Sequence, residues 1–192
     1  MVEIRDAGQG VPARCVVVVF GSSRTPTGTS AWQQAYVLGR ELAQAGWAIA
    51  NGGYGGTMEA VSRGAREAGG YVIGVTCAVF DPLLPNPWLS EERRKSSLFA
   101  RLMELITLGD AYVALPGGIG TQSEVTLVWN LLQTNSLPLR PFVLIGSSWA
   151  RLIEAFAHYT EMENDVLKLA RLAEDVKEAI RFLINFKGDG NA

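Results

Sequence analysis

The stretch Leu115–Glu124, LPGGIGTQSE, combines three glycines, a proline, a threonine and a carboxylate. It lies between an apolar run, Ala111–Leu115, and an apolar-periodic run, Val125–Leu132, so we expect it to join a strand to a helix. The exposed N–H groups and the dipole at a helix start favour an anion, and glycines let the backbone approach a phosphate closely. The stretch therefore predicts a site for a phosphorylated small molecule.

A purely structural interpretation of the same residues is also open. Thr121-Gln122-Ser123-Glu124 has the S/T-x-x-E pattern of a capping box, in which Thr121 caps the helix and Glu124 reaches back to a backbone N–H. A capping box does not account for the glycines and the proline beside it. The chain has no P-loop pattern, and the dinucleotide fingerprint fails at Ser123.

Two more glycine-rich stretches follow apolar runs. GSSRTPTG at 21–28 follows Cys15–Phe20, and NGGYGG at 51–56 follows Trp47–Ala50. Apolar strands that alternate with helices predict an α/β protein: a Rossmann-like three-layer sandwich, a parallel sheet with helices on both faces. All three glycine loops then leave the carboxyl ends of strands and meet at one edge of the sheet.

The remaining elements follow from periodicity. We expect a single domain over residues 14–186, preceded by a flexible N-terminus at 1–13. Further strands are predicted at Tyr71–Val75, Ala111–Leu115, Phe142–Ile145 and Val166–Leu169. Helices are predicted at Ser30–Ala45, Thr57–Ala68, Glu91–Leu108, Trp149–Tyr159 and Ala173–Asn185.

Composition excludes several classes of function. A net charge of −2 does not indicate a nucleic-acid partner, and no apolar run is long enough to cross a membrane. No signal peptide opens the chain, so a cytoplasmic protein is expected. Cys15 and Cys77 are predicted to be small core residues. The single histidine, His158, and the scarce lysines argue against a catalytic triad, a metal site and a Schiff-base cofactor, so neither metal nor cofactor is expected.

PGGIGTQSE fits the PGGxGTxxE signature of the LOG proteins, which are cytokinin-activating phosphoribohydrolases, and the chain resembles that family from about Cys15 to Ile145. Gly21–Ser23 is similar to the loop after the family's first strand. Asn51–Val75 is similar to its second glycine loop with the helix and strand that follow. Arg101 lies where the family has its catalytic arginine, one helix before the PGG loop.

The resemblance implies hydrolysis of the N-glycosidic bond of a nucleoside 5′-monophosphate, giving the free base and ribose 5-phosphate. Arg101 and Glu124 would be catalytic: Arg101 would hold the phosphate or ribose, and Glu124 would stabilise an oxocarbenium-like transition state and orient or deprotonate the water. A position in the first helical turn would favour ionised Glu124. The resemblance also implies a homodimer. The residues expected to bind phosphate or nucleotide are Gly21, Ser22, Ser23, Gly52, Gly53, Gly56, Gly117, Gly118, Ile119, Gly120 and Thr121.

The chain departs from the LOG pattern in three respects. Leu102 follows Arg101 where plant proteins have Arg-Lys, and Asn51 replaces the first glycine of a GGG triplet. Ser123 and Leu127 stand where family members often have further glutamates. These differences resemble a bacterial branch that is also similar to molybdenum-cofactor carrier proteins. The alternative function is therefore a non-catalytic carrier or sensor that binds a phosphorylated ligand such as the molybdenum cofactor.

Several candidate side chains have a second interpretation. Arg101 is also compatible with the edge of an apolar stripe, paired with Glu104 or solvated. The charged run at 92–95 fits a solvated helix start or a segment folded over a ligand. Glu59 fits a helix surface near the pocket, and Trp129 fits the core or a dimer interface better than a base-stacking platform.

Overall fold

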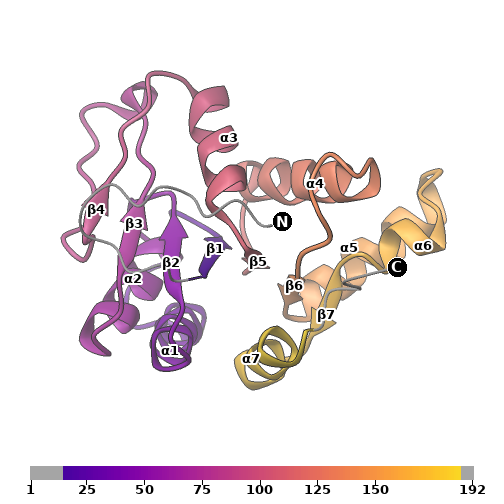
Figure 1. Cartoon of the computed structure of the whole chain (residues 1–192), viewed down its shortest axis with the longest axis horizontal. Helices are drawn as coiled ribbons and strands as arrows, with labels where there is room; N and C mark the ends of the chain where they lie inside the picture. Colours follow the sequence, from indigo (N-terminus) through magenta and orange to yellow (C-terminus); the bar gives the residue numbers. More distant parts are fainter. Residues whose placement is uncertain (1–14, 187–192) are drawn as a thin grey trace, which may run out of the picture.

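The computed structural model describes residues 15–186 as a seven-stranded parallel sheet between two layers of helices (Figure 1). The strands are β1 (Val16–Phe20), β2 (Ala48–Asn51), β3 (Val72–Gly74), β4 (Glu91–Glu92), β5 (Ala111–Ala114), β6 (Phe142–Ile145) and β7 (Arg171–Ala173). The helices are α1 (Ser30–Gln44), α2 (Thr57–Glu67), α3 (Leu98–Leu108), α4 (Ile119–Gln133), α5 (Ser147–Tyr159), α6 (Asn164–Leu167), α7 (Val176–Asn185) and the short 3₁₀ helix η1 (Ala78–Phe80). The predicted Rossmann-like fold is confirmed, while the predicted flexible N-terminus at 1–13 lies outside the described residues.

Both faces of the sheet are covered, which explains the apolar run VVVVF. Successive side chains of a strand point to opposite faces. Val17 and Val19 pack with α1, α2 and α7, whereas Val18 and Phe20 pack with α3, α4 and α5. A strand with two buried faces has no polar positions, so its sequence shows no alternation.

The order of the strands reverses direction at the centre of the sheet. The order is β4-β3-β2-β1-β5-β6-β7, so the chain runs outward from β1 in one direction and then from β5 in the other. In open parallel sheets, ligands bind outside the carboxyl ends of the strands where this direction reverses. The loops after β1, β2 and β5 lie at that position.

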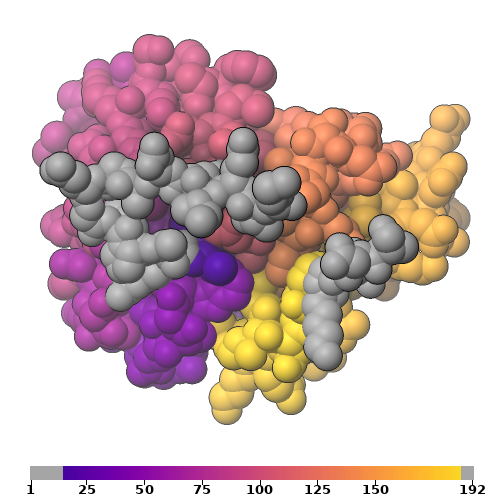
Figure 2. Space-filling view, in the orientation of Figure 1, coloured from indigo at the N-terminus to yellow at the C-terminus, as the bar shows by residue number. Residues whose placement is uncertain are grey.

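Helices α1 and α2 pack unusually closely on one face. A β-carbon at Gly39 would lie 2.0 Å from the carbonyl oxygen of Val61, and one at Gly64 would lie 2.0 Å from that of Tyr36. These two glycines therefore allow the helix backbones to touch. Helices α3 and α4 pack on the other face of the sheet. In the space-filling view of Figure 2, the pink segment that includes α3 borders the orange segment of α4.

The predicted start of the helix at Glu91–Leu108 is wrong. The helix predicted from Glu91 begins at Leu98, and the Ser97 side chain caps it by accepting from the Ala100 N–H at 3.2 Å. Glu91 and Glu92 instead form β4, an edge strand paired with β3. An edge strand tolerates charged side chains because one of its sides meets solvent.

The last predicted strand and helix are also displaced. Val166 belongs to α6 rather than to a strand, and its carbonyl oxygen accepts from Trp129 Nε1 at 2.5 Å. Strand β7 follows instead, and α7 begins after Asp175, whose side chain accepts from the Glu178 N–H at 2.8 Å. A short apolar run fits a strand or a buried helical turn equally well, so periodicity alone did not separate them.

The residues singled out by composition lie as follows. Cys77 is buried as predicted, but Cys15 is exposed, because it precedes the first residue of β1. His158 is exposed on α5. Within residues 15–186, no helix is long and apolar enough to span a membrane, and no cluster of three metal-ligating side chains occurs.

Candidate functional site

The loop after β1 lies against the start of α2. The Ser22 carbonyl oxygen accepts from the backbone N–H of Thr57 at 2.9 Å and from its hydroxyl at 3.1 Å. Gly56 precedes Thr57 with φ +69°, and a β-carbon on it would lie 2.2 Å from the same Ser22 oxygen. Only glycine fits this close approach. The Thr57 N–H therefore already donates to a group of the protein.

The loop after β5 adjoins the loop after β1. A β-carbon at Gly21 would lie 2.3 Å from the hydroxyl of Thr57 and 3.5 Å from Cβ of Leu115, and the Leu115 N–H donates to Phe20 O at 2.9 Å. A β-carbon at Gly117 would lie 2.1 Å from the Thr121 hydroxyl. The three glycine loops therefore meet at one edge of the sheet, as predicted.

Asn51, at the end of β2, holds the second glycine loop in place. Its side chain is completely buried and fully partnered. The amide nitrogen donates to Ser62 Oγ at 2.9 Å and to Met58 O at 3.3 Å, and the amide oxygen accepts from the Gly53 N–H at 2.8 Å. Sequence reasoning treated Asn51 as a departure from a triplet of glycines and missed this role, although an Asn before Gly-Gly is typical of a side chain that caps its own turn.

The beginning of α4 differs from a capping box. The N-cap is Gly118 with no side-chain cap, and Thr121 is the buried third residue of the helix. The first intrahelical bond runs from Gln122 N to Gly118 O at 3.1 Å, so the N–H groups of residues 119–121 have no partner within the helix. The capping-box interpretation is wrong, as is the expectation that Glu124 lies in the first turn, because the helix begins at Ile119.

Arg101 and Glu124 face each other across the site. Their side chains are only 12% and 13% exposed, and Arg101 Nη1 lies 3.5 Å from Glu124 Oε1. Arg101 Nε also donates to the carbonyl oxygen of Val75, beyond the end of β3, at 2.8 Å. The alternative pairing of Arg101 with Glu104 is wrong, because Glu104 binds Arg93 and Lys95.

Glu124 has an unusual protonation equilibrium. Burial raises the pKa of its carboxyl from 4.5 to about 7, although the charge and the hydrogen bond of Arg101 act in the opposite direction. Burial is the largest of these effects. The expectation that a helix start favours ionised Glu124 is therefore corrected: this carboxyl exchanges its proton near neutral pH.

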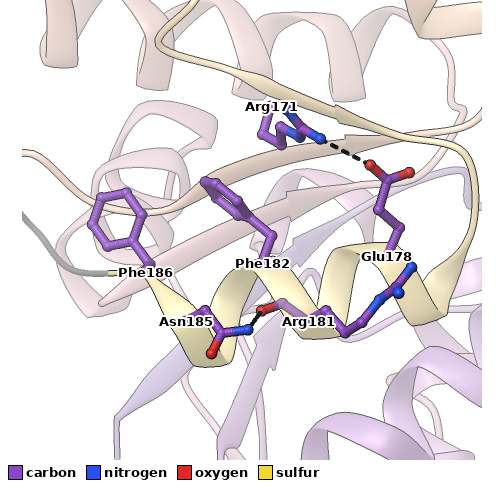
Figure 3. Close-up of a pocket in the computed structure, with 6 residues that line it drawn as sticks. All are labelled: Arg171, Glu178, Arg181, Phe182, Asn185 and Phe186. Carbon is purple, nitrogen blue, oxygen red and sulfur yellow. Dashed lines mark hydrogen bonds and ion pairs between the residues drawn. The ribbon is translucent and has the colours of Figure 1, made fainter.

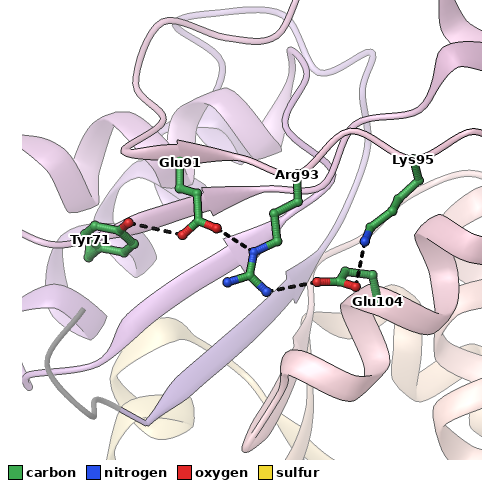
Figure 4. Close-up of polar contacts among 5 residues, drawn as sticks. All are labelled: Tyr71, Glu91, Arg93, Lys95 and Glu104. Atoms are coloured by element: carbon green, nitrogen blue, oxygen red, sulfur yellow. Dashed lines mark hydrogen bonds and ion pairs between the residues drawn. The ribbon is translucent and has the colours of Figure 1, made fainter. Parts of the chain in front are cut away.

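The charged run before α3 ties that helix to the sheet. Figure 4 shows a chain of polar contacts that runs from the residue before β3, through β4 and the segment after it, to α3. It is made by Tyr71, Glu91, Arg93, Glu104 and Lys95. Arg93 lies 2.6 Å from Glu91 and 2.9 Å from Glu104. Burial alone would raise the pKa of Glu104, but hydrogen bonds from Lys95 and Arg93 bring it below its usual value. Since Glu104 is on the helix that carries Arg101, this network ties that helix to the edge of the sheet; the charged run at 92–95 is not a solvated helix start.

The other candidates divide into surface and core. Ser23, Gly118 and Gly120 are exposed, and Ile119 is 84% exposed. Glu59 is half-buried in the first turn of α2. Trp129 is a core residue, as predicted: it is 2% exposed and packs edge-on against Phe142, so it offers no face to a nucleotide base.

Two hollows of about 650 and 780 Å³ lie near β7 and α7, away from this site. Figure 3 shows the smaller one, in which Arg171 pairs with Glu178 at 3.0 Å beside the ring of Phe182. Neither hollow is lined by a predicted site residue.

The parallel sheet, the reversal of its strand order at β1 and β5, and the glycine loops at its carboxyl edge define a Rossmann-like α/β protein. The SLOG cluster4 family matches residues 14–137, and the chain belongs to this family.

Two relatives are named as phosphoribohydrolases. The chain is 28% identical to the cytokinin riboside 5′-monophosphate phosphoribohydrolase of Rhodococcoides fascians over 91% of each chain. It is 36% identical to the probable cytokinin riboside 5′-monophosphate phosphoribohydrolase LOGL5 of Oryza sativa subsp. japonica, over 66% of this chain and about half (52%) of the rice protein.

Among solved structures, the molybdenum cofactor carrier protein of Chlamydomonas reinhardtii has a TM-score of 0.65 and 25% identity, over 88% of this chain and 95% of that one. The molybdenum cofactor binding protein of Rippkaea orientalis, at 22% identity, shares the fold with a TM-score of 0.71, over 89% of this chain and 96% of that one.

Proposed function

We propose that the protein hydrolyses the N-glycosidic bond of a nucleoside 5′-monophosphate and releases the free base and ribose 5-phosphate. The observation that carries this proposal is the largely buried Arg101–Glu124 pair, 3.5 Å apart, at the edge where three glycine loops meet. The similarity to proteins named as cytokinin riboside 5′-monophosphate phosphoribohydrolases supports it.

The start of α4 suits the 5′-phosphate. The N–H groups of Ile119, Gly120 and Thr121 have no helical partner, and the helix dipole adds positive potential there. Nothing lies within 4 Å of where a β-carbon would be at Gly118 or Gly120, so a phosphate has open access to the backbone. At the start of α2, by contrast, Ser22 O already accepts from the first N–H.

Glu124 suits the bond-breaking step. As the base departs, positive charge develops on the ribose, and an ionised carboxylate beside it lowers the energy of that oxocarbenium-like state. A water then adds to C1′, and the carboxylate accepts its proton. The base leaves with the electron pair of the broken C–N bond and takes up a proton from solvent. A pKa of about 7 gives Glu124 both an ionised fraction near neutral pH and enough basicity to take that proton.

Arg101 suits the binding of the phosphate or ribose oxygens. Its guanidinium has five N–H donors. Among residues 15–186, Nε donates to Val75 O and Nη1 contacts Glu124, while Nη2 donates to no protein group. Nη2 is therefore available to a ligand, and the charge of Arg101 keeps a fraction of Glu124 ionised beside it.

We also propose that the enzyme is a homodimer. Three large apolar side chains are exposed in the first turns of α3 and α4, the helices that carry Arg101 and Glu124: Leu98 at 49%, Phe99 at 74% and Ile119 at 84%. Exposed apolar surface of this kind is typical of an interface. Phe99→Ser would lower the mass measured by sedimentation equilibrium from twice 20.7 kDa to one chain; a wild-type monomer would refute the dimer.

A non-catalytic carrier of a phosphorylated ligand is the second candidate. It is favoured by the similarity to a molybdenum cofactor carrier protein at 25% identity. The same backbone donors would hold the phosphate of such a ligand. A pterin retained through purification would support the carrier, whereas retained AMP or ribose 5-phosphate would support the enzyme.

The deciding experiment measures free-base release from a panel of nucleoside 5′-monophosphates by chromatography. The wild type should release base from at least one nucleotide, and Glu124→Gln should lose most of that activity while still binding nucleotide. Glu154→Gln is the matched control, because it makes the same change at an exposed position on α5. No release from any nucleotide by the wild type would refute the hydrolase and leave the carrier.

A further inference from the structure

A fourth segment beside the glycine loops reaches Arg101. After β3 the chain forms η1, and its last residue, Phe80, lies with its ring centroid 5.7 Å from Cζ of Arg101. Phe80 is 39% exposed, although its ring is large and apolar. A guanidinium within about 6 Å of an aromatic centroid is attracted to the ring face. Phe80 is absent from the family signature, so sequence reasoning gave it no role.

The ring of Phe80 is held by Tyr54. The two rings are 5.4 Å apart and meet edge to face, at 81°. Tyr54 is 3% exposed, and its hydroxyl both donates to Cys77 O at 3.0 Å and accepts from the Cys77 N–H at 2.9 Å. Asn86 closes the other end of this segment, with its side chain donating to Tyr54 O at 3.1 Å. The segment from Cys77 to Asn86 is thus anchored on the second glycine loop.

The second glycine loop also restricts the position of the Arg101 guanidinium, from another side. A β-carbon at Gly52 would lie 1.9 Å from Nη2 of Arg101 and 3.1 Å from its Cζ. The guanidinium therefore rests against the backbone of Gly52, beside the ring of Phe80, while Val75 O fixes its Nε. These contacts define one orientation, in which Nη1 points to Glu124 and Nη2 remains free.

We infer that Phe80, supported by Tyr54, is a positioning residue that holds the Arg101 guanidinium in its orientation toward Glu124 and the bound ligand. Phe80 would act through Arg101 rather than on the reacting atoms. The inference rests on the proposed function only for the identity of the ligand; the orientation of Arg101 relative to Glu124 is testable without any ligand.

The primary test is the titration of Glu124 by NMR of protein labelled with ¹³C at glutamate side chains, with Glu124→Gln to assign the signal. Arg101 lowers the pKa of Glu124. In Phe80→Leu, which keeps an apolar side chain but removes the ring, the guanidinium becomes less constrained and the Glu124 pKa should rise. Phe80→Tyr keeps the ring and should restore the wild-type value. Leu84→Ala, 81% exposed on the same segment, is the matched control.

A double-mutant comparison separates positioning from a local change in packing. In an Arg101→Gln background, Phe80→Leu should not move the Glu124 pKa any further. The same shift in both backgrounds, or no shift in Phe80→Leu alone, would overturn the inference. Melting temperatures of all variants are recorded beside the titrations.

The second readout is the dissociation constant of AMP, measured by calorimetry. Phe80→Leu should weaken binding about two- to fivefold, the size of an exposed cation–π contact, and Phe80→Tyr should reverse this. If wild-type protein binds no AMP, the proposed function fails, while the titration still decides the role of Phe80. Equal affinity in wild type and Phe80→Leu, with an unchanged Glu124 pKa, would refute the positioning role.

Discussion

Replacement of Glu124 by glutamine tests whether burial or the attraction of Arg101 controls the carboxyl. The side chain is 13% exposed and lies 3.5 Å from the guanidinium. Its pKa of about 7, against an ordinary 4.5, corresponds to about 3 kcal/mol of differential interaction between its two protonation states. Glutamine has the same shape and does not titrate, so the difference between the two proteins isolates this one group.

The sign of the effect follows from proton linkage. At pH below about 4.5, Glu124 is protonated in both the folded and the unfolded chain. Between about 4.5 and 7, the folded protein retains a proton that the unfolded chain has lost, so the free energy of unfolding falls as pH rises. The stability of wild type relative to Glu124→Gln should therefore decrease by about 3 kcal/mol between pH 4.5 and pH 8, or about 6–12 °C in melting temperature.

The assay is urea unfolding of wild type, Glu124→Gln and the control Glu154→Gln at a series of pH values. Subtracting the variant curve removes the contributions of all other titrating groups. A stability difference that is flat with pH would refute a raised pKa for Glu124. A difference that grows with pH would show that Arg101 stabilises the carboxylate by more than burial costs it, which would reverse the reasoning.

Three further predictions concern the same region and its support. If Glu124 accepts the proton of the attacking water, kcat for base release should rise with an apparent pKa near 7, and a profile flat from pH 5 to 9 would contradict that role. Gly52→Ala places a β-carbon 1.9 Å from Arg101 Nη2. It should reduce base release about 100-fold with little change in melting temperature, because a displacement of roughly 1 Å in a binding group costs about that much. Gly55→Ala, whose β-carbon would have no neighbour nearer than 3.9 Å, should remain active, and equal activities of the two variants would disprove the contact. Gly39→Ala forces a β-carbon to 2.0 Å from a backbone carbonyl of α2 and should lower the free energy of unfolding by about 1–3 kcal/mol in urea titrations, whereas an unchanged midpoint would show that the two helices can separate freely.

The fold was largely readable from the chain because its signals are local. Runs such as VVVVF at the first strand mark strands buried on both faces, and glycine-rich stretches after them mark the loops at the carboxyl edge. Errors arose where a short segment satisfied two patterns. Glu91 fitted a helix by its neighbours in sequence, but it lies in β4 and pairs with Ile73 of β3, because an open sheet edge was available to it.

The chemical state of the site depends on groups that are remote in sequence. Arg101 and Glu124 could be named from their motif, but their separation and the raised pKa arise from the burial of both side chains between α3 and α4. The helix-start argument predicted the opposite shift, because it considered only the local dipole. Desolvation is set by every atom that packs around a carboxyl, and no local pattern contains that information.

The PGG motif, the glycines that permit close backbone approach and the alternation of strands and helices are properties of neighbouring residues, and the order of the chain was sufficient to establish them. The contacts of Asn51 with α2 and of Phe80 with Arg101 were decided by tertiary packing. Asn51 meets Ser62, and Arg101 meets Phe80, only after α2 and α3 have packed on the sheet. A side chain's partners, and hence its charge and orientation, are fixed by the neighbours that the completed fold brings within a few ångströms.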